Sequence, residues 1–347
     1  MPRATTKRYK VTLVGLGTMG RRHARVLCAL RDRFEVVGAY DVQADAQPLG
    51  DVARLGSDDE AIARGEVVVV ATPMEAHASI AARALAAGRH VLVEKPLCAN
   101  AADAYRLVAC ARRGARLFVG HSERFNPVVR ALVRLVRGQQ VVAIDLHRAG
   151  PLRPNAGSAL VTLGVHDFDL AAYLGGGGVV FESALGSSTY DGTSPALPGC
   201  GRDQDATSPA LPGPGRDKVA GDDFAHVLFR TASGAAGHLF VDRCAPARRR
   251  TLMLTTPRWV YEGDLLDHRL VRISRPVGAR REVPLPLEEP LQAQAVALAD
   301  AIDGSASREL ATGVDGARAV ELAERAMAQI GSAPSTRERK SLSGPAR

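Results

Sequence analysis

The chain has 347 residues, of which 46% are hydrophobic and 24% charged, a composition typical of a soluble globular protein with room for two domains. Aromatic residues make up 4%, which argues against a base-stacking surface for nucleic acid, and the apolar runs are too short to span a bilayer. Most of the net charge of +8 lies at the ends, because residues 1–10 carry +4 and residues 335–347 carry +3, so we expect neither a nucleic-acid nor a membrane partner.

The first third of the chain alternates apolar strands with helical patterns. Strands are predicted at 10–17, 34–41, 66–73, 90–96 and 115–121, and helices at 18–32, 58–64, 74–88 and 100–114. Strands this apolar are typical of a parallel sheet that helices cover on both faces. The pattern predicts an α/β fold that opens with a doubly wound, Rossmann-type domain over residues 1–122.

From about residue 140 the pattern changes to successive strands joined by hairpin signals. The predicted strands are 140–150, 178–190, 222–243 (interrupted by the turn "TASGAAG"), 249–264 and 268–276, with helices at 166–174, 288–304 and 314–330. This order predicts an α+β domain over 123–332 with an open, mostly antiparallel sheet, followed by a disordered tail at 333–347. A homodimer or homotetramer through this sheet is the expected assembly.

One segment of the second domain is a duplication. "TSPALPGCGRDQDA" at 193–206 is followed by the near-copy "TSPALPGPGRDKVA" at 207–220. Such a Pro- and Gly-rich stretch buries too little apolar surface to order itself. We interpret 193–220 as a flexible insertion between two strands, with a lid over a binding site as the alternative.

The cysteines and the N-terminal residues give an expectation for the cellular location. The five cysteines, Cys28, Cys98, Cys110, Cys200 and Cys244, are odd in number and match no zinc-binding or CxxC spacing. They are expected to be free thiols in a reducing environment, and no metal site is predicted. The basic N-terminus leads into a strand rather than an apolar leader, so no signal peptide is expected and the cytoplasm is the predicted location.

A glycine-rich turn follows the first strand. Gly15, Gly17 and Gly20 form a G-x-G-x-x-G pattern that opens a helix, the context in which this pattern indicates dinucleotide binding at the helix N-terminus. Asp41 ends the second strand, where a carboxylate binds both ribose hydroxyls and repels a 2′-phosphate. The sequence therefore predicts NAD rather than NADP as the cofactor.

Five motifs together resemble the Gfo/Idh/MocA oxidoreductases. They are "GLGTMGRRHARVL" (15–27), "ATPMEAHASIA" (71–81), "VLVEKPL" (91–97), "VGHSERFNP" (119–127) and "GVHDFDL" (164–170). The resemblance covers about residues 8–330 and is carried most specifically by "EKP". It implies a Rossmann domain and a substrate domain, with NAD(P) between them and the substrate over the nicotinamide.

The resemblance also implies roles for single residues. Lys95 of "EKP" projects into the active site toward the reacting hydroxyl, and the peptide before Pro96 is typically cis. His166 is the acid/base that takes the hydroxyl proton. Many relatives carry an aspartate where this chain has Thr162. Of the neighbouring acids, Asp167 is expected to cap the helix, and Asp169 either assists His166 or lies at the surface.

The remaining motif residues give candidates for binding. Cofactor contacts are expected at Thr18, Met19, Ala71, Thr72, Pro73, His77 and Glu94, besides the glycines, Asp41 and Lys95. Substrate contacts are expected at His121, Arg124, Asn126, Arg148, Arg153 and Thr162. Two of these have a structural alternative: His77 is a packed histidine, and Arg124 is an interdomain ion pair.

The combined pattern predicts an NAD-dependent dehydrogenase that converts a secondary alcohol of a sugar to a ketone. The stretches "HRAGPLRPNAG" (147–157) and "VGHSERFNP" (119–127) resemble family members that oxidise UDP-sugars. This resemblance makes a nucleotide sugar such as UDP-N-acetylglucosamine the first candidate, with Arg148 and Arg153 expected to meet its diphosphate. A cyclitol or aldose dehydrogenase, and an aldose–aldose oxidoreductase with permanently bound cofactor, are alternatives. A non-catalytic NAD-binding regulator on the same fold is the alternative outside enzymes.

Overall fold

The computed structural model describes residues 7–43, 50–111, 114–152, 157–187, 222–305 and 308–332. Arg153, the duplicated segment 193–220 and the segment 333–347 lie outside these ranges. Within them, no helix combines the length and the apolar character needed to cross a membrane.

The first sheet has five parallel strands in the order β2-β1-β3-β4-β5. The strands are β1 (Tyr9–Val14), β2 (Phe34–Tyr40), β3 (Val67–Val70), β4 (His90–Val93) and β5 (Leu117–Val119). The central strand β3 consists of four valines with no exposed surface, as expected for a sheet that is covered on both faces. The doubly wound prediction is confirmed.

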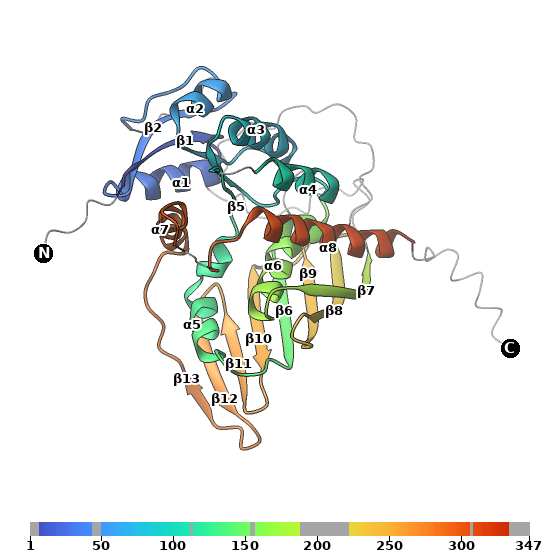
Figure 1. Ribbon diagram of the computed structural model, residues 1–347. Helices are drawn as coiled ribbons and strands as arrows, with labels where there is room; N and C mark the ends of the chain where they lie inside the picture. Colours follow the sequence, from blue (N-terminus) through green and yellow to red (C-terminus); the bar gives the residue numbers. More distant parts are fainter. Residues whose placement is uncertain are drawn as a thin grey trace, which may run out of the picture.

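Helices cover both faces of this sheet. The connecting helices are α1 (Thr18–Ala29), α2 (Asp58–Arg64), α3 (Met74–Ala86) and α4 (Ala101–Cys110). Residues of α2, α3 and α4 share one core with the sheet, and residues of α1 share the other with α7 (Pro290–Ile302). The sequence placed 288–304 with the second domain, whereas the structure packs α7 beside α1, so the chain returns to the first sheet (Figure 1).

The second sheet has eight strands in the order β13-β12-β11-β10-β6-β9-β8-β7. The strands are β6 (Ala143–Ala149), β7 (Val179–Ser187), β8 (Phe224–Thr231), β9 (Ala236–Asp242), β10 (Arg249–Thr255), β11 (Trp259–Asp264), β12 (Arg269–Ser274) and β13 (Arg280–Glu282). The β6–β9 pair is parallel and the other pairs are antiparallel, which confirms the mostly antiparallel α+β prediction.

The two faces of this sheet differ. Its inner face packs against α5 (Pro127–Leu135), α6 (Val165–Leu174) and α8 (Gly313–Ser332). Its outer face leaves large apolar side chains exposed, because burial alternates along each strand. Val180, Leu185, Leu228 and Met253 are 63%, 68%, 48% and 40% exposed.

Two short helical turns join the sheets near the carboxyl end of the first one. The 3₁₀ turn η1 (Ser122–Phe125) follows β5, and the π-helical turn η2 (Leu160–Gly164) leads into α6. Helix α8 runs between α4 and α6 and contacts both (Figure 1). These elements bring the ends of β4 and β5 against the start of α6, where the sequence placed its candidate residues.

Candidate active site

The glycine turn after β1 has the geometry of a dinucleotide-binding loop. Gly15 has a φ of +96°, and a Cβ there would lie 2.5 Å from the Ala71 carbonyl oxygen. A Cβ on Gly20 would lie 1.9 Å from the Gly15 carbonyl oxygen, so this glycine allows α1 to pack closely on the turn. A Cβ on Gly17 would meet nothing within 4 Å. The open side of the turn is therefore at Gly17 and the exposed Thr18, with Met19 partly exposed beside them.

Asp41 lies beside this turn. Its carboxylate accepts hydrogen bonds from the backbone N–H of Leu16 at 2.6 Å and of Gln43 at 2.9 Å. These bonds hold the acid at the end of β2, next to the N-terminus of α1. The turn thus places the N-terminus of α1 beside a carboxylate, the arrangement with which dinucleotide-binding loops hold a pyrophosphate and a ribose.

His77 connects the segment after β3 to the "EKP" segment. Its Nδ1 is 2.9 Å from the Pro96 carbonyl oxygen, and its Nε2 is 2.9 Å from that of Thr72. The ring is buried, which matches the packed-histidine alternative. His77 thus fixes the segment Ala71–Thr72–Pro73, which is partly or fully exposed beside the glycine turn.

Glu94 is buried under the same segment. Its carboxylate is 2.7 Å from His23 Nε2 and accepts a 3.3 Å hydrogen bond from the Lys95 backbone N–H. Burial acts to raise the pKa of Glu94, but His23 and the charge of Lys95 outweigh it and lower that pKa. Glu94 is thus a buried carboxylate next to Lys95. Its partner His23 was not among the residues that the sequence analysis singled out, although it lies in the "GRRH" stretch of α1.

Lys95 reaches from the first sheet to the second part of the molecule. The peptide between Lys95 and Pro96 is cis, as the resemblance implied. Lys95 Nζ donates a 3.0 Å hydrogen bond to the Thr162 carbonyl oxygen in the π-helical turn. π-Helical turns occur often at functional sites, and this one immediately precedes His166.

His166 and His121 meet in this region. Their ring centroids are 5.7 Å apart in an edge-on arrangement. Among the described residues, His166 Nδ1 and both nitrogens of His121 are buried without a hydrogen-bond partner. Burial lowers the pKa of both rings, and for His166 the charges of Lys95, Arg148 and Arg250 lower it further, to well below 6.5. Both imidazoles are therefore neutral near pH 7.

Thr162 does not act on His166 through its hydroxyl. The Thr162 Oγ1 donates to the Ser158 carbonyl oxygen at 2.9 Å. Thr162, which stands where many relatives have an aspartate, thus places no negative charge beside His166. Its backbone carbonyl accepts the hydrogen bond from Lys95.

Arg148 forms a buried ion pair instead of an exposed anion site. Its guanidinium contacts both Asp167 oxygens at 2.7–3.1 Å and Glu123 at 3.2 Å, and its side chain is 2% exposed. The expectation of a diphosphate contact at Arg148 is not supported, because carboxylates surround this cation. Asp167 pairs with Arg148 and does not cap α6, which corrects the helix-cap expectation. Arg250 reaches the same Glu123 at 2.7 Å.

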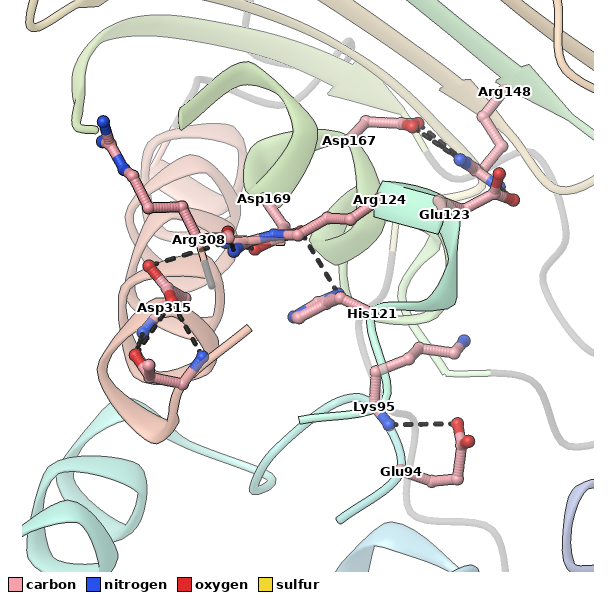
Figure 2. A network of polar contacts seen from close by, with 11 residues as sticks. Glu94, Lys95, His121, Glu123, Arg124, Arg148, Asp167, Asp169, Arg308 and Asp315 are labelled. Carbon is pink, nitrogen blue, oxygen red and sulfur yellow. Dashed lines mark hydrogen bonds and ion pairs between the residues drawn. The ribbon is translucent and has the colours of Figure 1, made fainter. Parts of the chain in front are cut away.

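Arg124 forms a second buried ion pair, whose partners also lie in the second domain. Its guanidinium contacts Asp169 at 2.5 and 2.8 Å, and Asp315 of α8 lies 3.5 Å away. Burial opposes the charge, but Asp169 outweighs it and raises the pKa of Arg124. Arg124 is thus structural, as the alternative expected, but its acidic partners lie in its own domain and not across the domain boundary. Asp169 is neither at the surface nor bonded to His166. Figure 2 shows both ion pairs with His121 and Lys95 close by.

Asn126 also has structural partners. Its side chain accepts from the Val128 backbone N–H at 3.0 Å as the cap of α5, and its amide donates to the Leu265 carbonyl oxygen at 2.9 Å. Arg153 lies outside the described residues. Of the six expected substrate contacts, His121 and Thr162 therefore lie beside Lys95 and His166, whereas Arg124, Arg148 and Asn126 are bound within the fold.

Comparison with known families explains this arrangement. One family model, described as the oxidoreductase family with an NAD-binding Rossmann fold, matches residues 9–121, and the Gfo/Idh/MocA C-terminal domain matches residues 138–260. The chain belongs to the Gfo/Idh/MocA oxidoreductase family. The resemblance drawn from the motifs is confirmed. No curated protein matches the chain by sequence.

Solved structures share the fold over nearly the whole chain. UDP-N-acetylglucosamine 3-dehydrogenase GnnA from Acidithiobacillus ferrooxidans is 22% identical, with a TM-score of 0.78 and coverage of 93% of this chain and 98% of that one. Levoglucosan dehydrogenase with NADH and levoglucosan is 17% identical, with a TM-score of 0.77 and coverages of 94% and 97%. GenD2 from gentamicin A biosynthesis, in complex with NAD, is 25% identical, with a TM-score of 0.72 and coverages of 96% and 97%.

Proposed function

We propose that this protein is an NAD-dependent dehydrogenase that oxidises a secondary hydroxyl of a sugar to a ketone. The observation that carries the proposal is the convergence of Lys95 Nζ with two neutral imidazoles, the buried His121 and the partly buried His166, at the carboxyl end of the first sheet. A cation beside a neutral imidazole is the pair needed to remove a proton while negative charge develops on oxygen. When bound, NAD accepts the hydride from the substrate carbon.

The residues of this chain then divide the remaining work. Lys95 donates a hydrogen bond from Nζ to the reacting oxygen and stabilises the charge that develops there. His166 accepts the hydroxyl proton, and Nε2 is the nitrogen assigned to this step, because Nδ1 is enclosed. Gly15, Gly17 and the N-terminus of α1 hold the pyrophosphate, and Asp41 binds the ribose hydroxyls, which favours NAD over NADP. Glu94 is held by His23 and accepts a hydrogen bond from the backbone N–H of Lys95, which positions that residue.

A nucleotide sugar such as UDP-N-acetylglucosamine remains the first candidate substrate. It is supported by the fold shared with GnnA, a UDP-N-acetylglucosamine 3-dehydrogenase, and by Arg250, whose side chain is 37% exposed beside the buried Arg148. Aldoses and cyclitols are the alternatives. We also propose that the protein assembles as a homodimer or homotetramer through the exposed apolar outer face of the second sheet.

The test is NADH formation across a panel of UDP-sugars, aldoses and inositols, after mass spectrometry of any ligand that copurifies. Activity with one class, lost in the double variant Lys95→Ala/His166→Ala, supports the proposal. The rival function is an NAD-binding regulator, which is favoured by one observation: no carboxylate is hydrogen-bonded to His166 among the described residues. Tight NAD binding without turnover on any member of the panel supports that rival.

A further inference from the structure

Four polar side chains gather on the outer face of the second sheet, away from the site described above. Asp145 and His147 lie on β6, and residues two apart on a strand point to the same face. The parallel register of β6 and β9 pairs Asp145 with His238. His226 on β8 lies beside His238, with its ring stacked on that of His238 at a centroid distance of 5.3 Å.

The possible ligand atoms of this group lie close to one another. One carboxylate oxygen of Asp145, Oδ1, is 3.3 Å from His147 Nε2 and 2.6 Å from His238 Nδ1. All three ligand atoms lie within 4.8 Å of one another. Tetrahedral zinc with bonds of about 2.0–2.1 Å places neighbouring ligand atoms roughly 3.3 Å apart. Small side-chain rotations therefore bring this trio to zinc-binding geometry.

A further contact orients one of the ligands. His226 Nδ1 is 3.0 Å from His238 Nε2. If His238 bound a metal through Nδ1, its Nε2–H would donate to His226, which is the outer hydrogen bond that metal-binding histidines usually make. The rings of His147 and His226 both pack against Phe240, which supplies an apolar border.

The group is also accessible from outside. Asp145, His147 and His238 have side chains about 30% exposed, at 31%, 31% and 30%. Asp145 and His147 line a cavity of about 360 Å³ that Met253 also borders. In the unassembled chain an ion can therefore reach the trio, and a fourth coordination position is left for water or another ligand.

We propose that Asp145, His147 and His238 form a zinc-binding site on the outer face of the second sheet, with His226 as the residue that orients His238. Two imidazoles and one carboxylate are a ligand set that Zn²⁺ favours. Imidazole and carboxylate ligands bind zinc only when they are deprotonated, so the affinity should weaken as the pH falls. The cysteine spacings gave no indication of this site, because none of its ligands is a cysteine.

The test is titration of the metal-free full-length protein with Zn²⁺ by calorimetry, and with Co²⁺ by visible absorption, which reports four-coordinate nitrogen and oxygen ligands. We expect one Zn²⁺ per chain. His147→Ala and His238→Ala should each weaken binding at least tenfold, and Asp145→Asn, which keeps the shape of the side chain, should also weaken it. His268→Asn removes an exposed histidine on the β11–β12 connection, where φ is +50° and Asn is tolerated, and should leave the affinity within twofold.

The outcomes separate a built site from adventitious binding. If zinc binds with equal affinity to the wild type and to the double variant His147→Ala/His238→Ala, the ion is adventitious and the proposal is wrong. Absence of a visible Co²⁺ spectrum together with absence of calorimetric binding overturns it as well. Melting temperatures measured without metal show whether each variant is folded, and Asp145→Asn gives a second probe if a histidine variant is not.

Discussion

Lys95 is held between the two parts of the molecule by a hydrogen bond that substrate can replace. Its Nζ donates to the Thr162 carbonyl oxygen at 3.0 Å, beside His166. If Lys95 contacts the reacting oxygen, Lys95→Ala should lower kcat by roughly 10²–10⁴, the usual contribution of a positioned proton-transfer group. NAD affinity should change little, because the glycine turn and Asp41 hold the cofactor.

The measurement is steady-state NADH formation with calorimetric NAD titration, and Lys10→Ala on the exposed side of β1 is the matched control. Unchanged turnover with weakened NAD binding would make Lys95 a cofactor contact instead.

The pH dependence at His166 follows from its surroundings. Burial and the charges of Lys95, Arg148 and Arg250 hold its pKa well below 6.5. A base with a lowered pKa stays deprotonated to lower pH, so the acid limb of kcat/KM should lie below pH 6.5. From the sequence alone, a limb near the unperturbed value of about 6.5 is expected. The structure corrects that value downward. An acid limb above pH 6.5 would contradict the electrostatic account.

Thr162 offers a direct test of the missing carboxylate. Thr162→Asp adds a negative charge one turn before His166, which favours the imidazolium and should move the acid limb upward. Thr162→Asn introduces a side chain of the same size as aspartate but without its charge, so it should leave the acid limb in place. Equal shifts in both variants would show that the loss of the bond from Thr162 Oγ1 to Ser158, not charge, is responsible.

At the scale of elements, two glycines of the same turn should respond differently to substitution: one change should affect NAD binding and the other stability. Gly17 has a φ of −66° and open space where a Cβ would lie, so Gly17→Ala should fold normally but obstruct the pyrophosphate. We expect NAD affinity to fall at least tenfold with an unchanged melting temperature. Gly20→Ala places a Cβ 1.9 Å from the Gly15 carbonyl oxygen, so it should cost about 1–3 kcal/mol of stability. Thermal melting and NAD titration distinguish the two, and equal effects would refute the assignment.

The duplicated segment 193–220 lies outside the described residues, but the strands at its two ends do not. Ser187 of β7 pairs with Phe224 of β8, so the ends of the connection are already adjacent. Deleting one copy, 193–206, should therefore change stability by less than about 1 kcal/mol, since loop-closure entropy varies slowly with length. Turnover should also be retained. A larger loss in thermal melting would show that the segment contributes to the fold or the site.

At the scale of the whole molecule, the sequence predicted the parts and missed the long-range pairings. Strand and helix periodicity located both sheets, and short motifs located Gly15, Lys95 and His166, because such signals are local in the chain. Arg148 and Asp167 are 19 positions apart, and Arg124 and Asp169 are 45 apart, so no local pattern indicated their ion pairs. The return of α7 to the first sheet is likewise a tertiary contact. Arginine and histidine motifs therefore suggested binding where several of these residues form ion pairs or hydrogen bonds within one domain.

The outer face of the second sheet gives the last prediction. Leu185 and Leu228 lie on neighbouring strands and are 68% and 48% exposed, and exposed apolar patches of this kind mark association surfaces. If two chains associate there, burying a charge at the contact without a partner should be strongly unfavourable. Leu185→Glu should therefore convert the assembled protein to monomer in light scattering coupled to size-exclusion chromatography. Leu287→Glu is the matched control, because Leu287 is fully exposed and lies outside the second sheet. A wild-type monomer, or an oligomer that Leu185→Glu leaves intact, would exclude this face as the interface.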